Sequence, residues 1–91
     1  MPKVEISRSH EFTMEKAKEK VDILANDLKD KYKLTTSWSG YCLDFKRTGA
    51  KGKIQLEDKK VIVTVDLSML LSALKSKVEE RINQKLDEEF S

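Results

Sequence analysis

Hydrophobic and polar residues alternate with a period of two in five stretches of the chain, 3–8, 34–39, 41–46, 53–57 and 61–66. In the first stretch, Val4 and Ile6 alternate with Glu5 and Ser7. This period is typical of a β-strand with one buried face, so the pattern predicts five strands. Residues 48–52 are expected to form the loop that reverses the chain between the third and fourth strands.

Two other stretches have the hydrophobic spacing of amphipathic helices. The first is expected to begin after Thr13 as N-cap and to end near Tyr32. The second is expected to begin after Ser68 as N-cap and to continue to Phe90. The predicted order is therefore β-α-β-β-β-β-α. Because each strand has one apolar face, we expect a single α+β domain over residues 1–91: a two-layer sandwich of a mostly antiparallel sheet with both helices on one face.

The apolar stripe of the last helix rotates around the helix axis. Its residues step by four from Leu74 through Val78, Ile82 and Leu86 to Phe90. Each such step drifts about 40° on a straight helix, so Phe90 lies about 160° around from Leu74. The terminal turns are therefore predicted to run past the sheet or to cross it diagonally. Two interpretations stay open: the stripe packs on the first helix, or Ile82, Leu86 and Phe90 contact a second copy in a homodimer.

Composition narrows the class of protein without naming an activity. The 18 basic and 16 acidic residues give a net charge of +2, which is too balanced to indicate nucleic acid by itself. The chain has no apolar stretch long enough for a transmembrane helix and no segment of signal-peptide type. With a single cysteine, Cys42, no internal disulfide can form. These features together favour a cytoplasmic protein.

Residue types that perform catalysis or bind metals are scarce. His10 is the only histidine and Cys42 the only cysteine, and no glycine-rich phosphate-binding motif is present. We therefore expect a non-enzyme without a cofactor or a metal site. The alternation directs Trp38, Tyr41 and Phe45 inward, so the open face of the sheet should lack the aromatic side chains on which RNA bases stack.

One basic cluster lies at the predicted turn between the third and fourth strands. Within eight residues it holds four positive charges and two glycines: Lys46, Arg47, Gly49, Lys51, Gly52 and Lys53. Such a hairpin can bind phosphate or an acidic partner. The alternative is a solubilising turn that discourages edge-to-edge pairing.

The chain also resembles a bacterial family named for the polyhydroxyalkanoic acid system. The resemblance rests on residues 6–10, Trp38-Ser39-Gly40, residues 43–49, Gly52-Lys53-Ile54, residues 70–75, Val78-Glu79 and Leu86-Asp87. It implies an association with polyester storage granules and no defined activity. The positions matching the family's recurrent polar and glycine residues are Arg8, His10, Arg47, Gly49 and Gly52.

Three functions follow for testing. The leading hypothesis is a non-enzymatic accessory protein of granule metabolism that binds a protein partner or the granule surface. The second is a ribosome- or nucleic-acid-associated module, because the element order is similar to that of ribosome-hibernation factors. Residues 13–33 hold six basic and five acidic side chains, however, a poor electrostatic footprint for RNA. The third is a small-ligand carrier, whose pocket of about 300 Å³ or more would compete with the core.

Overall fold

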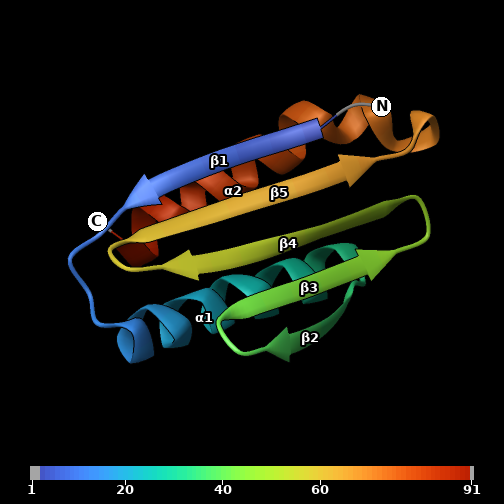
Figure 1. Ribbon diagram of the computed structural model, residues 1–91. Coiled ribbons are helices and arrows are strands. Elements are labelled where there is room, and N and C mark those ends of the chain that lie inside the picture. Colours follow the sequence, from blue (N-terminus) through green and yellow to red (C-terminus); the bar gives the residue numbers. More distant parts are fainter. Residues whose placement is uncertain (1–2, 91) are drawn as a thin grey trace.

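The computed structural model describes residues 3–90, apart from the side chain of Leu70. Figure 1 shows the elements, which follow the predicted order. Their bounds are β1 (Lys3–Ser9), α1 (Met14–Tyr32), β2 (Thr35–Ser39), β3 (Cys42–Arg47), β4 (Ala50–Glu57), β5 (Lys60–Leu67), η1 (Met69–Leu74) and α2 (Lys75–Phe90).

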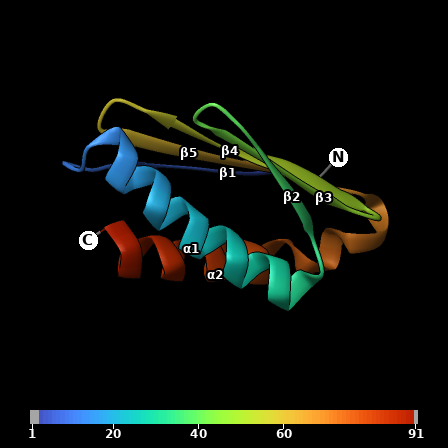
Figure 2. The ribbon, with the colours of Figure 1, turned by 90° about the horizontal axis from the view of Figure 1, so that it is seen from below.

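The strands form one antiparallel sheet in the order β1-β5-β4-β3-β2. Both helices cover the same face, which leaves the other face open (Figure 2). The predicted two-layer α+β sandwich is confirmed. It forms because Val, Ile and Leu at alternate strand positions and the apolar stripes of both helices are buried against one another.

Two boundaries differ from the predictions. The turn between β3 and β4 is shorter than the predicted 48–52 loop. This is because β4 already begins at Ala50, which pairs with Arg47 of β3. The last helix begins with a six-residue 3-10 segment, η1, before α2 starts at Lys75. Ser68 is the N-cap residue as predicted, but its side chain makes no capping hydrogen bond. Thr13 does cap α1, since its hydroxyl accepts from the backbone N–H of Lys16.

The C-terminal stripe lies inside the molecule. Of the two predicted courses of the terminal turns, past the sheet or diagonally across it, the first is therefore wrong. Ile82 and Leu86 are fully buried and Phe90 is 8% exposed. The rotation of the stripe is accommodated because α1 lies alongside α2 (Figure 2), while the ring of Phe90 packs on His10 and Phe12 from the β1–α1 connection. Packing against the first helix and its N-terminal loop is the correct interpretation. Ile82, Leu86 and Phe90 are therefore not free to form the contact proposed for a homodimer.

A bidentate ion pair joins α1 and α2. The guanidinium of Arg81 on α2 donates to both carboxylate oxygens of Asp27 on α1, at 2.6 and 2.9 Å. These hydrogen bonds lower the pKa of Asp27 below its ordinary value of 3.8, and they outweigh the opposing effect of burial. Because the pKa of Asp27 is lower in the folded protein, this pair stabilises the fold above pH 3.8, and its contribution is lost as the pH falls through the lowered pKa.

We expect Asp27→Asn to destabilise the protein at pH 6 and to have less effect at pH 2, because a larger fraction of wild-type Asp27 is protonated as the pH falls through its lowered pKa. The measurement is urea unfolding followed by circular dichroism at both pH values. Asp30→Asn is the matched control, because Asp30 is an exposed carboxylate on the same helix without an ion pair among the described residues. An equal pH dependence for the two variants would show that the Asp27–Arg81 pair does not link the helices.

Candidate functional site

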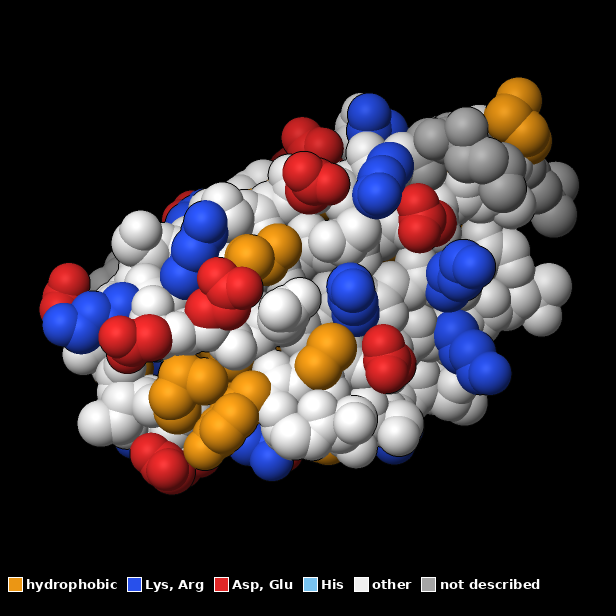
Figure 3. Space-filling model, viewed as in Figure 1, with side chains coloured by type: hydrophobic (Ala, Val, Ile, Leu, Met, Phe, Trp, Pro, Cys, Tyr) orange, Lys and Arg blue, Asp and Glu red, His pale blue; other side chains and the backbone are white. Residues whose placement is uncertain are grey.

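The open face of the sheet is mostly polar, with acidic and basic side chains interspersed and a few hydrophobic side chains among them (Figure 3). Phe45 is buried on the helix side, and the indole N–H of Trp38 donates to Asp22 of α1 at 3.0 Å. Tyr41 differs from the prediction, because it lies in the β2–β3 turn and is 40% exposed. Its hydroxyl still points to the helix layer, toward Glu15 at 3.5 Å. None of these three rings therefore offers a stacking platform on the open face.

The basic cluster predicted at the β3–β4 turn is split between two paired strands rather than held in a loose hairpin. Lys46 of β3 lies directly opposite Lys51 of β4, and Lys53 lies opposite Asp44. These side chains border a shallow hollow of about 530 Å³ on the open face, lined among others by Ser37, Asp44, Lys46, Lys51, Lys53 and Asp66. Two carboxylates therefore offset much of the positive charge in the hollow.

Both glycines of the basic cluster have structural explanations. A Cβ on Gly52 would overlap the carbonyl oxygen of Thr64 and lie 2.8 Å from the ring of Phe45. Gly49 has φ +86°, and a Cβ there would lie 2.9 Å from Leu71 of η1. The match of these glycines to the family positions is therefore explained by packing and turn geometry.

Arg47 holds the sheet to α1. Its guanidinium donates to the carbonyl oxygen of Tyr32 in the last turn of α1 at 3.0 Å. This contact satisfies one of the carbonyl groups that a helix leaves unpaired at its C-terminus. Because the rest of the Arg47 side chain is exposed, the residue also contributes positive charge to the surface.

Arg8 and His10 lie at the opposite end of the sheet from this cluster, so the structure does not bring the predicted residues into one site. Arg8 pairs in β1 with Val61 at the start of β5, whereas Ala50 pairs with Leu67 at its end. The Arg8 guanidinium donates to Asp87 at 2.6 Å and to Asn83 at 3.0 Å, both on α2. Arg8 therefore links β1 to α2.

His10 is 5% exposed and belongs to the aromatic contact that holds the end of α2. Its Nδ1 accepts from the backbone N–H of Phe12 at 3.1 Å, which places the ring proton of the neutral imidazole on Nε2. Cys42 lies on the open face, opposite Gln55, while His10 packs in the helix layer against Phe90. A Cys–His catalytic pair therefore does not form between these residues.

The space between sheet and helices is nearly filled. The apolar gap beneath η1, lined by Leu28, Phe45, Leu71 and Leu74 among others, has a volume of about 30 Å³. That is about the volume of one water molecule and roughly a tenth of a typical ligand pocket. Among residues 3–90, no three His, Cys, Asp or Glu side chains are grouped as a metal site would require.

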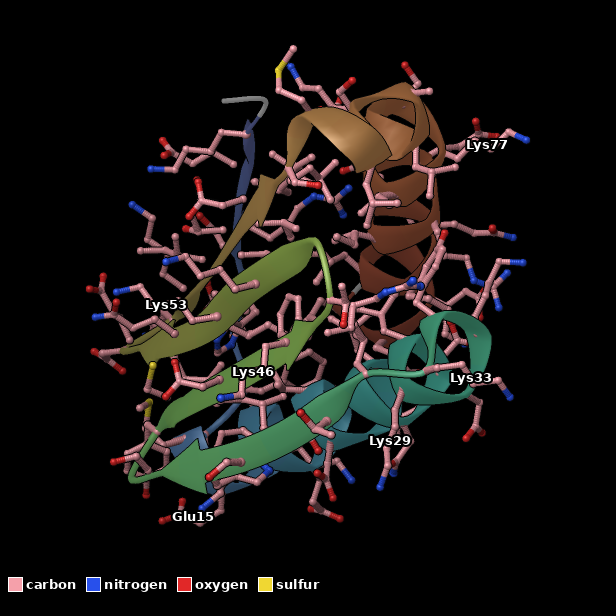
Figure 4. All side chains as sticks on the ribbon, turned by 90° about the vertical axis from the view of Figure 1, so that its right-hand side faces the viewer. Glu15, Lys29, Lys33, Lys46, Lys53 and Lys77 are labelled. Carbon is pink, nitrogen blue, oxygen red and sulfur yellow. The ribbon has the colours of Figure 1, made fainter. Side chains whose placement is uncertain are left out.

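A feature that the sequence patterns did not indicate is a basic end of the molecule, where the β3–β4 turn, the end of α1 and the start of α2 meet. Figure 4 looks onto this end, with Lys33, Lys46 and Lys77 contributed by those three parts of the chain. We define the basic end by its exposed cationic side chains, Lys31, Lys33, Lys46, Arg47, Lys51 and Lys77. Only the fold brings them together, since they are up to 46 positions apart in the chain.

These features define a small α+β sandwich. Its Arg8, His10 and Arg47 side chains make structural contacts, and its most prominent surface feature is the basic end. The chain belongs to the family described as "Putative polyhydroxyalkanoic acid system protein", whose model matches residues 4–90. No curated protein and no solved structure matches the chain. In the described part of the chain, no helix has both the length and the apolarity needed to cross a membrane.

Proposed function

We propose that this protein is a cytoplasmic, non-enzymatic accessory protein of the polyhydroxyalkanoate system, which binds a protein partner or the surface of the storage granule. The observation that carries the proposal is the family match over residues 4–90 of the 91-residue chain. Because the match overlaps every strand and helix, the family relationship concerns the whole fold.

The burial of His10 and the contacts of Arg8 favour a binding function over a catalytic one. His10 is buried between aromatic rings, and Arg8 is engaged with Asp87 and Asn83. An acid or base catalyst must reach the proton that it transfers, so these contacts remove the best candidates from that role.

Neither alternative function has a comparable argument. A carrier needs an internal pocket, and the gap of about 30 Å³ between sheet and helices is too small for a ligand. A sheet that binds single-stranded RNA would present aromatic rings on its open face, where the described residues place polar and charged side chains instead.

The proposal is tested by imaging a fluorescent fusion in cells that accumulate polyester granules and in the same cells without them. The fluorescent protein should follow the C-terminus, because β1 begins close to the basic end whereas α2 ends far from it (Figure 1). We expect signal concentrated at granules in the first cells and diffuse signal in the second. Diffuse signal in granule-rich cells would contradict the proposal.

A further inference from the structure

Charge is segregated along the long axis of the molecule, which measures 38 Å against 22 and 21 Å for the other two. The basic end carries the six cationic side chains defined above, bordered by the carboxylates of Asp66 and Glu80. The far end, where α2 finishes beside the β4–β5 turn, carries Glu11, Glu57, Asp58, Asp87, Glu88 and Glu89. Four lysines also lie at that end: Lys59 and Lys85 are paired with Glu11 and Glu88, and Lys16 and Lys60 are exposed. The net charge of +2 therefore conceals a difference in charge between a basic end and an acidic end.

The lysines of the basic end are free of ion pairs within the described residues. Lys46 and Lys51 lie directly opposite each other on β3 and β4, an arrangement of like charges that destabilises a sheet and that Asp66, opposite Lys51 on β5, offsets only in part. The other cations of the basic end line two surface hollows. Lys33 lines one of them with Lys46 and Arg47, and Lys31 lines the other with Lys77. Neighbouring unpaired cations of this kind are stabilised when an anion comes between them.

The charged residues at the two ends of α2 are placed unfavourably with respect to its helix dipole. Lys75 and Lys77 lie in its first turn, and Asp87, Glu88 and Glu89 lie in its last. A helix dipole favours acidic groups at its start and basic groups at its end, so this placement lowers helix stability. Helix stability therefore does not explain why the cations gather at the basic end.

An exposed apolar side chain lies at the same end. Met69, the first residue of η1, is 73% exposed and is the most exposed large hydrophobic residue among those described. Its segment is anchored, because the N–H of Ser68 donates to the carbonyl oxygen of Gly49 at 2.8 Å and Leu71 packs against Gly49. Met69 therefore projects from a fixed position next to the β3–β4 turn.

We infer that the basic end is a docking surface for an anionic phospholipid layer, with the lysines contacting headgroups and Met69 entering the layer. The inference deepens the proposed function, on which it rests, by naming the surface that reaches a granule and the chemistry it recognises. Cations around an exposed apolar side chain are the combination by which peripheral proteins bind anionic interfaces. The acidic far end is repelled by the same layer, so the charge asymmetry turns the molecule end-on during approach.

A nucleic acid is the other polyanion that a lysine cluster attracts, and two observations favour the lipid. Met69 has no role in contacting phosphates, but it gains by leaving water at an interface. Within residues 3–90, the only exposed aromatic residue is Tyr41, which lies at the far end in the β2–β3 turn. The one ring at the basic end, Tyr32, is half-buried and packs against the core, so this end has no exposed ring for base stacking.

The test is co-sedimentation of the full chain with vesicles of phosphatidylcholine and phosphatidylglycerol (3:1) and with vesicles of phosphatidylcholine alone, at 50 mM NaCl. The basic-end variant is Lys46→Gln, Lys51→Gln and Lys77→Gln. Its control is Lys16→Gln, Lys59→Gln and Lys60→Gln at the far end, which has the same net charge. Each lysine near an anionic surface contributes about a fivefold change in affinity, so we expect a loss on the order of 100-fold for the basic-end variant and less than about fivefold for the control.

Met69→Ser separates lipid from nucleic acid. We expect it to weaken vesicle binding about fivefold and to leave any binding to a 20-nucleotide RNA unchanged. Absent binding to the anionic vesicles, equal losses for the two triple variants, or RNA binding tighter than vesicle binding would each overturn the inference.

Imaging the same variants distinguishes this inference from the proposed function. If the basic-end variant still gathers at granules, another surface recruits the protein, so the inference fails and the proposed function stands. If the wild type binds vesicles but remains diffuse in granule-rich cells, the proposed function fails and the lipid-binding surface stands.

Discussion

Leu86→Asp is expected to lower the free energy of unfolding by about 4 kcal/mol and to leave most of the protein unfolded under mild denaturing conditions. Leu86 is fully buried, and a carboxylate at this position would lose its hydration without gaining a partner. The stability of a domain of this size is about 5–15 kcal/mol, so the change removes a large part of it. Urea unfolding followed by circular dichroism measures the effect.

Ile23→Asp is the control for this variant, because it makes the same kind of change at a helix position that is 48% exposed. We expect it to cost less than about 1 kcal/mol. The comparison also tests the location of the C-terminal stripe. If Leu86→Asp folded normally and only changed the mass in analytical ultracentrifugation, Leu86 would lie in a contact between two copies and not in the core.

Gly52→Ala is expected to lower the free energy of unfolding by about 3 kcal/mol. The added methyl group would overlap the carbonyl oxygen of Thr64 and press on the ring of Phe45, so two strands have to separate. Overpacking of this kind costs about 1–3 kcal/mol where only side chains move, and the backbone oxygen here cannot move independently of β5. At about 4–8 °C per kcal/mol for a domain of this size, the melting temperature should fall by about 12–24 °C.

Gly40→Ala is the matched control for the glycine variant. A Cβ at Gly40 meets nothing within 4 Å, so only its φ of +62° opposes the substitution. We expect a cost of about 1 kcal/mol, typical of one alanine in the left-handed region. In the Gly52→Ala background, Phe45→Leu should recover part of the loss. Equal melting temperatures for the two glycine variants would contradict the close packing described at Gly52.

The strands were predictable because alternation at positions such as Val61, Val63 and Val65 depends only on local geometry. The early start of β4 was hidden, since Ala50 and Gly52 occupy inward positions without large apolar side chains. The residues that the C-terminal stripe contacts could also not be predicted from the sequence. Whether Phe90 meets a second copy or its own chain depends on where the β1–α1 connection passes, and the structure places His10 and Phe12 there.

The candidate site illustrates a different limit. Counting charges over whole helices gave values near zero, because the basic end of α1 and the basic start of α2 were averaged with acidic residues elsewhere on the same helices. Since α1 and α2 run in opposite directions, their basic ends lie together (Figure 2). Of the basic end, the sequence indicated only Lys46, Arg47 and Lys51, which form a dense basic cluster with two glycines, whereas Lys31 and Lys33 lie in a segment of nearly balanced charge.

Sedimentation of granules tests the central claim most directly, because it asks whether the fold itself recognises the storage granule. Polyester granules washed free of bound protein are mixed with purified full-length chain and recovered on a density gradient at 50 mM and 500 mM NaCl. We predict that the protein travels with the granules at low salt, that most of it is released at high salt, and that the far-end lysine variant behaves like the wild type. Protein that remains at the top of the gradient at 50 mM NaCl would contradict the account.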